Sequence, residues 1–409
     1  MRHTVRFLGL VSLIAAFCWG SAAFAGAVTS KEEIMISTTG GGIKIKSNNG
    51  NSFAIGGMIQ YDYDSYDGIW NYADNGDDDT ASESEFRRTR VTLKGTSGQD
   101  WAYYLTVDVD EGEAEVNSGY LAYKGLALGK ILVGRFKAPF GLEELTSDKW
   151  INTIERSPAS GLGFLVGKPS FQVAVHGHGG PLFWQAALID EDKEDEDGSD
   201  AYSIATRLGA HMPIGEGSFV HLAGSYATRD FGDGATQRFS TRLGTHTIQS
   251  RPIDFKDIGV DDADQFGLEG ALVMGPLSLQ GEYHQADFDA GDEGTPSDVD
   301  IEGSYVQASY VLTGETRGYK GKSGKFDRVK PKGPMGAWEL VAKYADGELD
   351  VEAEAKKTEY ELLTLGLNWY ATNNVRFMLN YLDADANHAN NSGDEDDGQA
   401  MSFRAQYVF

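Results

Sequence analysis

Cysteine is almost absent from this chain of 409 residues. The single thiol, Cys18, lies within residues 1–25, which have the pattern of an export signal. This stretch carries Arg2 and Arg6, then the apolar run FLGLVSLIAAFCWG, then AFA, a small-x-small cleavage pattern. The bulky Phe17 before the cysteine argues against a lipoprotein. We therefore expect a mature chain without disulfides, thiolate metal sites or a cysteine nucleophile.

Long hydrophobic runs are also missing. The apolar run of the export signal is too short for a comfortable membrane span. No later segment approaches the roughly 20 consecutive apolar residues that a spanning helix needs. These observations exclude a helical membrane protein.

Positive charge is scarce, with 35 Lys and Arg against 62 Asp and Glu and a formal net charge of −27. A nucleic-acid partner held by a broad basic surface is therefore excluded. The acidic residues gather in DNGDDD, DEDKEDEDGSD, DDAD and SGDEDDG. We interpret these stretches as solvated loops, with divalent-ion binding as the alternative, although none has the residue order of a calcium-binding loop.

Motifs for catalysis and metal binding are lacking as well. The patterns GxSxG, HExxH and the P-loop do not occur in the sequence. His176 and His178 alternate along one face of an expected strand, but no third ligand stands at a definite spacing from them. We expect no enzymatic activity, no cofactor and no metal site.

What the sequence does have is a two-residue alternation of apolar and polar side chains from residue 51 onward. In WAYYLTVDVD, for example, Trp101 and Leu105 fall on one face of a strand, and Thr106 and Asp108 fall on the other. The pattern recurs in about 16 segments of the length that a tilted strand needs to cross a bilayer. It predicts an all-β fold, a transmembrane antiparallel β-barrel whose last strand, in AMSFRAQYVF, closes against the first.

The connections between these segments alternate in length. Short ones are TSGQ, GLALG, GHGGP, MPIGEG, GP and ATNN, and between them lie the acidic stretches and the long stretches 137–170 and 228–263. Short turns inside and long loops outside are typical of outer-membrane barrels, whereas a soluble sandwich has no reason to sort its loops in this way. We expect a periplasmic segment over 26–50 and an outer-membrane barrel over 51–409.

Two connections stand out within this barrel. The stretch 137–170 is long and apolar, so we predict that it folds inward as a constriction loop; the alternative is an ordered surface loop at a subunit contact. The stretch 313–334 should be a short turn, yet it is long and basic. It could be a solvated turn packed under the barrel or a cationic vestibule that guides anions.

Cations gather on one expected strand, FRRTRVTLKG. Arg88, Arg90 and Lys94 share one parity, opposite two aliphatic residues. A charge on the lipid face costs roughly 2–4 kcal/mol at mid-bilayer, so these side chains should point into the lumen. Arg87 has the other parity and needs a strand end or a β-bulge to do the same. Inward arginines can select anions or merely line a wet pore, and both interpretations stay open here.

Several segments together resemble the phosphate-selective porin O and P family. They are FRRTR, WAYYLTVDVD, VGRFKAPFGLEELTSDKWINTIERS, LTGETRGY followed by KFDRVKP, GAWELVAKY and LGLNWYATNNVRFMLNY. The similarity runs from about GGIKIKSNNG to the end. It implies a trimeric, sixteen-stranded anion channel in the Gram-negative outer membrane, surrounded by lipid and lipopolysaccharide. Its solutes would be small anions, phosphate or polyphosphate.

The resemblance also implies a binding site at the constriction. The family's paired arginines match Arg87 and Arg88, its constriction lysine matches Lys149, and the aspartate of the neighbouring strand matches Asp108. Arginine forks meet phosphate oxygens bidentately, and lysine adds a mobile point charge. The aspartate would keep binding weak enough for release, which conduction requires.

The chain departs from the family pattern at several positions. Asp148 stands where the family has a serine, Glu144 where it has a further lysine, and of its external arginine ladder only Arg238 and Arg242 remain, in ATQRFSTRLGTHT. Carboxylates about 4 Å from these cations would counteract their field by several kcal/mol. A general or cation-tolerant diffusion porin is therefore the alternative to an anion porin. The predicted substrate-binding residues are Arg87, Arg88, Arg90, Asp108, Lys149, Arg238 and Arg242.

Overall fold

The structure, a computed structural model, describes residues 33–38, 40–70, 80–110, 113–127, 129–161, 170–191, 201–232, 235–248, 251–354, 356–387 and 396–409. The predicted signal peptide lies outside the described residues. So do the acidic stretch DNGDDD, most of DEDKEDEDGSD and SGDEDDG, and the last part of the predicted constriction loop.

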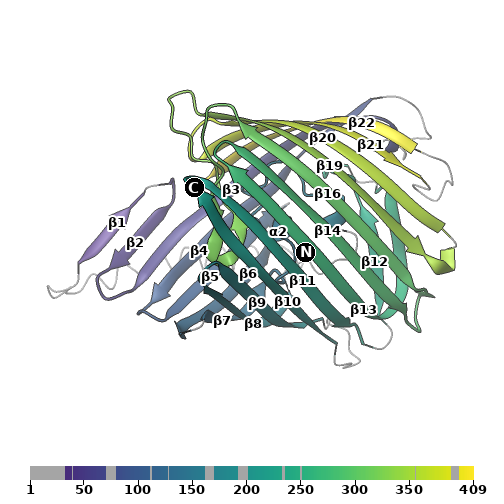
Figure 1. Ribbon diagram of the computed structural model, residues 1–409, viewed down its shortest axis with the longest axis horizontal. Helices are drawn as coiled ribbons and strands as arrows, with labels where there is room; N and C mark the ends of the chain where they lie inside the picture. Colours follow the sequence, from purple (N-terminus) through teal and green to yellow (C-terminus); the bar gives the residue numbers. More distant parts are fainter. Residues whose placement is uncertain are drawn as a thin grey trace, which may run out of the picture.

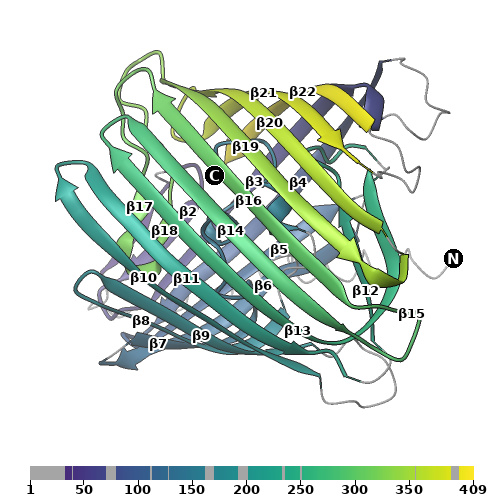
Figure 2. The same cartoon turned by 45° about the vertical axis from the view of Figure 1, so that its right-hand side comes forward.

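Sixteen long strands in the described residues pair in sequence order into a closed barrel (Figure 1 and Figure 2). All neighbouring pairs are antiparallel, and β22 closes the cylinder by pairing with β3. The predicted all-β barrel of about 16 strands is thus confirmed. The barrel strands are β3 (Ser52–Tyr66), β4 (Ala81–Ser97), β5 (Trp101–Asp110), β6 (Glu113–Leu126), β7 (Gly129–Phe136), β8 (Ser170–Gly179), β9 (Leu182–Asp190), β10 (Tyr202–Gly215), β11 (Ser218–Asp230), β13 (Ile253–Met274), β14 (Leu277–Ala290), β16 (Val299–Val311), β19 (Ala337–Val351), β20 (Lys356–Tyr370), β21 (Val375–Ala386) and β22 (Asp396–Val408).

Shorter elements lie at the two ends of the barrel and within it. A hairpin of β1 and β2 adds to β3 at the end of the barrel that holds the short turns. No helix in the described part of the chain is long and apolar enough to cross a membrane. The shorter elements are β1 (Ile34–Ser37), β2 (Ile43–Ser47), β12 (Thr236–Thr241), β15 (Thr295–Pro296), β17 (Tyr319–Lys320), β18 (Lys325–Phe326), α2 (Leu142–Leu145), η1 (Gly68–Trp70), η3 (Pro158–Ser160), η4 (Gly321–Ser323) and η5 (Glu352–Glu354).

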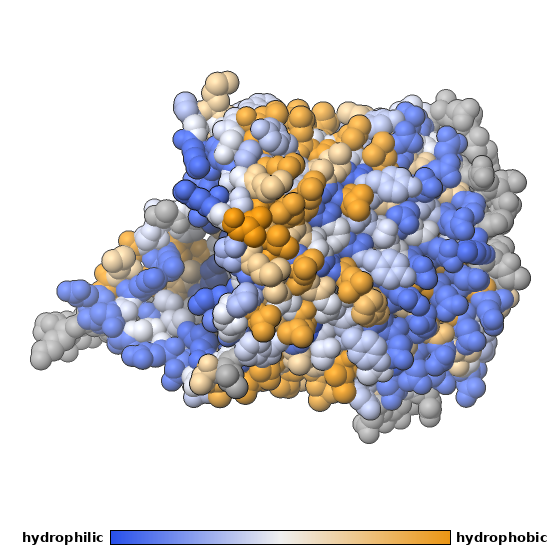
Figure 3. Space-filling model, in the orientation of Figure 1, coloured by the Kyte–Doolittle hydropathy of each residue, from blue (hydrophilic) through white to orange (hydrophobic). Residues whose placement is uncertain are grey.

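The alternation along each strand gives the barrel an apolar outside and a polar inside. On β16, Val306 and Tyr310 are exposed on the outer wall, whereas Gln307 and Ser309 are buried in the lumen. Figure 3 shows the result as a band of hydrophobic side chains across the wall, with hydrophilic side chains beyond it toward the strand ends on the right. This arrangement suits a cylinder whose wall contacts hydrocarbon and whose centre contacts water.

A long connection is present here, but the predicted bounds of 228–263 are wrong, because β11 (Ser218–Asp230) extends to Asp230 and β13 begins at Ile253. Within the described residues, this stretch contains the end of β11, β12 and the first part of β13, and the acidic DDAD (261–264) lies on β13, not in a loop. Asp262 and Asp264 point outward and are exposed, while Val260 and Ala263 are buried. A strand that continues beyond the hydrocarbon meets water and lipid headgroups, so its outer face no longer needs apolar residues.

Three segments fold into the barrel and reduce its open lumen. We call them the constriction loop (137–161), the mouth segment (236–248 and 251–258) and the basic connection (313–334). The mouth segment packs apolar side chains on the inner wall, with the rings of Phe239 and Phe288 4.9 Å apart. Leu142 of the constriction loop and Phe326 of the basic connection share a smaller buried cluster. The inward-folded constriction loop is thus confirmed over the residues described.

The outer wall allows a direct test of the barrel's orientation. Leu365 is exposed on β20, opposite Ala342 and Tyr381 on its neighbours. We expect Leu365→Arg to lower the free energy of unfolding by roughly 2–4 kcal/mol, because the charge would enter hydrocarbon. The measurement is urea unfolding of the barrel in lipid vesicles, with Leu365→Met as the control. An arginine variant as stable as the methionine variant would show that this face is not in hydrocarbon.

Candidate functional site

A β-bulge on β4 brings two consecutive arginines into the lumen. Gln60 of β3 pairs with Arg88 and Asp62 pairs with Glu85, so Phe86 and Arg87 together oppose one residue. Phe86 points outward and is exposed, whereas Arg87 turns inward to an ion pair in the lumen. The expectation that Arg87 needs a bulge to face the lumen is thus confirmed.

Asp148 of the constriction loop bridges two of the predicted arginines. Its Oδ2 atom lies 2.9 Å from Arg88 Nε and 2.5 Å from Arg90 Nη1. Arg90 also donates through Nε to Asp108 of β5 at 2.6 Å. Burial alone would raise the pKa of the Asp148 carboxyl, but the charges of Arg88 and Arg90 hold it well below its usual range. Asp148 is therefore a permanent anion at neutral pH.

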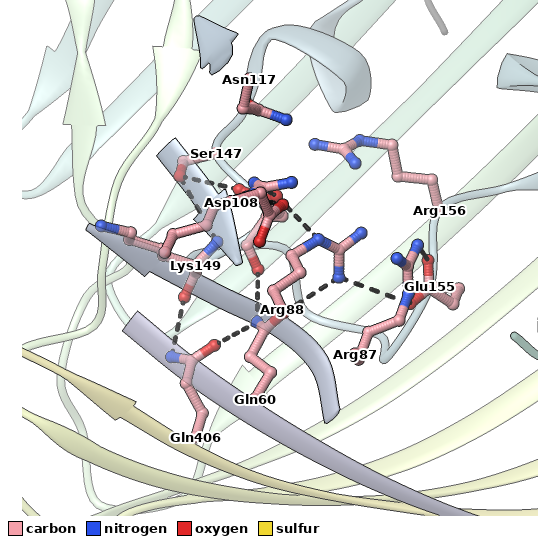
Figure 4. A network of polar contacts seen from close by, with 12 residues as sticks. Gln60, Arg87, Arg88, Asp108, Asn117, Ser147, Lys149, Glu155, Arg156 and Gln406 are labelled. Carbon is pink, nitrogen blue, oxygen red and sulfur yellow. Dashed lines mark hydrogen bonds and ion pairs between the residues drawn. The ribbon is translucent and has the colours of Figure 1, made fainter. Parts of the chain in front are cut away.

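A second carboxylate of the loop, Glu155, neutralises the other side of this cluster. Arg87 donates to both of its oxygens, at 2.9 and 3.2 Å, and Arg404 of β22 donates to it at 2.7 Å. Arg404 is fully buried and also binds both oxygens of Asp62 on β3, at 2.7 and 2.6 Å. Figure 4 shows Arg88 at the centre, with Glu155 and Arg87 on one side and Asp108 and Lys149 on the other.

Glu144 repeats the pattern with two further cations. Its carboxylate pairs with Lys137 and lies 3.0 Å from Arg156 Nε. Asp148 thus neutralises cations of the predicted site, whereas Glu144 neutralises Lys137 and Arg156, which lie outside the predicted set.

The loop that carries these carboxylates is held by the opposite wall of the barrel. Arg376 of β21 donates to the carbonyl oxygen of Ile151 at 2.8 Å, and Asn368 of β20 donates to that of Asn152 at 2.8 Å. Asn380 of β21 accepts from the N–H of Ile154 at 2.7 Å. Because the backbone of the loop is bound directly, its side chains are fixed across the lumen.

Lys149 differs in its surroundings from Arg87, Arg88 and Arg90. No carboxylate in the described residues forms an ion pair with it, and in Figure 4 its side chain points away from the arginines. Burial lowers the pKa of Lys149 to about 8, and the positive charges of Lys94, Arg90 and Arg328 add to this effect, whereas Asp148 opposes it. Its ammonium is thus a positive charge that the site offers to a passing anion, beside the charges of Lys94 and Arg328.

Arginines continue from the constriction toward the mouth segment. Arg242 lies near Arg87, and burial together with this like charge lowers the pKa of the Arg242 guanidinium. Arg238, farther out, is largely exposed and binds both oxygens of Asp254 at 2.5 and 2.7 Å. Arg251, which no sequence pattern singled out, donates to Ser240 at 2.6 Å and lies near Arg238 and Arg242. The two predicted arginines therefore belong to a group of three.

The basic connection supplies cations on the other side of the constriction. It reaches the constriction loop, where the N–H of Phe326 donates to Thr146 Oγ1 at 3.3 Å. Burial, with the nearby charges of Lys320 and Lys130, lowers the pKa of Lys325 to about 8. Arg328 lies 5.2 Å from the ring centre of Trp150, beside Lys149. The connection therefore lies inside the barrel and is not a solvated turn beneath it, while the cationic vestibule stays a prediction.

Of the seven predicted residues, the structure brings Arg87, Arg88, Arg90, Asp108 and Lys149 together at the constriction and leaves Arg238 and Arg242 nearer the mouth. Sequence reasoning missed Glu155 and Arg404. A signal for Arg404 existed, because barrel closure pairs β22 with β3 and sets this inward arginine directly opposite an inward Asp62. For Glu155 the sequence carried no such signal, because a loop residue has no strand register.

Removing the charge of Glu155 tests the role of these ion pairs in stability. We expect Glu155→Gln to lower the free energy of unfolding by about 3 kcal/mol, because it leaves Arg87 without a carboxylate and takes one of two carboxylates from the buried Arg404. Glu115→Gln is the control, since its partner Arg135 lies 3.3 Å away on an exposed surface where a pair contributes about 1 kcal/mol or less. Equal urea midpoints for the two variants would show that the ion pairs of Glu155 do not stabilise the barrel.

Comparison with known proteins agrees with this geometry. The family model described as phosphate-selective porin O and P matches residues 53–409. Porin O of Pseudomonas aeruginosa is 32% identical over 446 aligned positions, which cover 98% of this chain and 99% of that protein.

Solved structures share the fold at low sequence identity. The trimer form of OmpT, an outer membrane protein of Vibrio cholerae, matches with a TM-score of 0.56 and 15% identity, over 88% of this chain and 99% of that one. An anion-selective porin from Comamonas acidovorans matches with a TM-score of 0.55 and 14% identity, over 88% and 100%. The protein is an outer-membrane porin, and the chain belongs to the phosphate-selective porin O and P family.

Proposed function

We propose that this porin lets small anions, phosphate among them, diffuse passively across the outer membrane. The observation that carries the proposal is a continuous series of cations along the lumen. It begins with the arginines of the mouth segment, passes through the constriction and continues into the basic connection. The family supports the same function, and so does the shared fold of the anion-selective porin from Comamonas acidovorans.

The strongly acidic composition does not contradict anion passage, because many of the carboxylates lie on the outer wall. On neighbouring strands, Asp264 is opposite Asp287, which is in turn opposite Asp300, and all three are exposed and point away from the lumen. Charges on the outer wall are separated from the permeating ion by the barrel itself and are screened by salt within about 10 Å. The sign of the pathway is therefore set by the groups that line it.

At the constriction, the balance of charge leaves a weak preference for anions. The guanidinium groups of Arg87, Arg88 and Arg90 are each paired with a carboxylate of the loop. Lys149 contributes a positive charge that no carboxylate of the described residues pairs with. A shallow site of this kind favours conduction, because an ion must leave as readily as it enters.

The same pairing supports a second candidate, a general diffusion porin without phosphate preference. If the ion pairs persist during permeation, a solute meets neutralised arginines. Cations and neutral solutes would then pass with little discrimination.

We also propose that the porin is a homotrimer. The support is the trimer form of the similar OmpT structure. The test is the mass of the detergent-solubilised complex by multi-angle light scattering, where a mass of one chain would contradict the proposal.

Planar-bilayer recordings distinguish the two functions. In a KCl gradient we expect a reversal potential that favours chloride, together with partial block of the chloride current by phosphate. Lys149→Gln should reduce the chloride-to-potassium permeability ratio by about threefold, because it removes a positive charge of the constriction. Lys357→Gln, on the exposed outer side of β20, is the matched control and should change nothing. Cation preference without phosphate block would leave the general porin as the function.

The ratio should also depend on pH. Because the pKa of Lys149 is about 8, the lysine is mostly charged at neutral pH and loses its charge in alkaline solution. We expect chloride selectivity to fall between about pH 7 and about pH 9 as the lysine deprotonates. Lys325 titrates in the same range, so the contribution of Lys149 is the difference between the wild type and Lys149→Gln. A fall of equal size in both proteins would assign the effect to other groups.

A further inference from the structure

We propose that Asp148 is a tethered internal anion that occupies the binding position between Arg88 and Arg90, and that a permeating oxyanion binds there by displacing it. This inference rests on the proposed anion-channel function and names the residue that sets its affinity. The site is built from groups on two different elements. The guanidinium groups come from β4 and the carboxylate from the constriction loop.

Asp148 contacts the two arginines through only one of its two carboxylate oxygens. A single oxygen, Oδ2, serves both guanidinium groups. The other oxygen, Oδ1, accepts from Ser147 Oγ at the long distance of 3.4 Å. An arginine and a carboxylate usually pair through two parallel hydrogen bonds, as Arg404 and Asp62 do in this barrel. Asp148, together with Glu155 near Arg88 and Asp108 beside Arg90, therefore balances the charge of the two arginines without using their full donor capacity.

Arg88 keeps a hydrogen-bond donor that Asp148 does not satisfy. Its side chain is buried, with an exposed fraction of 5%. Its Nε lies 2.9 Å from Asp148 Oδ2, yet in the described residues this N–H has no acceptor in hydrogen-bonding geometry. A buried donor without an acceptor is destabilising, because it has lost its hydrogen bonds to water. A phosphate has several oxygens and could give each guanidinium its own acceptor, so it would bind Arg88 and Arg90 better than the carboxylate it replaces.

Displacement leaves the carboxylate with other partners. Lys137 and Arg156 lie within electrostatic range of Asp148, and both are held nearby by Glu144. The backbone of the loop stays fixed, because Gln60 donates to the Asp148 carbonyl at 3.4 Å and Gln406 donates to the Lys149 carbonyl at 3.2 Å. Only the side chain needs to turn. While the anion is bound, the same side chain competes for the arginines, and its return speeds the release of the anion.

The experiment compares variants of the full-length porin in planar bilayers, with inorganic phosphate as the probe. A tethered competitor acts at an effective concentration in the millimolar range, so its removal in Asp148→Asn should lower the half-blocking phosphate concentration by about tenfold. Asp148→Glu keeps the carboxylate and should stay near the wild type. Asp108→Asn removes the same charge beside Arg90 alone and should have a clearly smaller effect. Asp287→Asn, on the outer wall, should have none.

Added formate provides a readout that a purely structural role would not change. In Asp148→Asn, formate should occupy the vacated position and raise the half-blocking phosphate concentration again, whereas in the wild type it should have little effect. Asp148→Ser, with heat-modifiable mobility on gels as the check of barrel folding, repeats the test with a second side chain.

Three outcomes decide the matter. A tenfold gain in Asp148→Asn that formate reverses supports the inference. Equal effects of Asp148→Asn and Asp108→Asn, with no effect of formate, overturn it and reduce Asp148 to one charge among several, while anion passage stands. Cation preference and absence of phosphate block in the wild type and in all variants overturn the proposed function itself and the inference with it.

Discussion

The closure of β22 onto β3 is the constraint on which the rest of this molecule depends. A strand edge left open in hydrocarbon would expose unpaired backbone N–H and C=O groups, each at a cost of several kcal/mol. The hydrogen-bonded cylinder removes that cost and also fixes which side chains face inward. Closure sets Arg404 opposite Asp62, and from this buried pair the network of the constriction extends through Glu155 to Arg87.

The barrel wall, not the net charge of the sequence, decides which charged groups a solute in the lumen meets. A chain with a net charge of −27 would be expected to repel anions. The barrel places exposed carboxylates such as Asp287 and Asp300 on its outer side and keeps arginines and lysines along its lumen. The field that a solute meets is consequently local, and it depends on whether each lumen cation has a carboxylate within about 4 Å.

Much of the fold could be predicted because a barrel strand has a period of two, and that period is visible in the sequence. The inward direction of Arg88 and Arg90 follows from it, and so does the need for a bulge at Arg87. The loop contacts could not be predicted, because Glu155 and Asp148 meet their arginines across more than 50 intervening residues with no periodic relation. The bounds of the loop over 228–263 were predicted wrongly for a related reason, because outside the hydrocarbon a strand no longer shows an apolar face.

The anchoring of the constriction loop has a consequence for how the barrel assembles. The loop leaves the wall after β7, yet its backbone is bound by Asn368, Asn380 and Arg404, which belong to the last strands of the chain. These partners exist only after nearly the whole chain has been made, and they surround the loop once the seam between β22 and β3 is sealed. The loop can therefore reach its native hydrogen bonds only when the last strands are in place, which makes the constriction one of the last parts of the barrel to be completed.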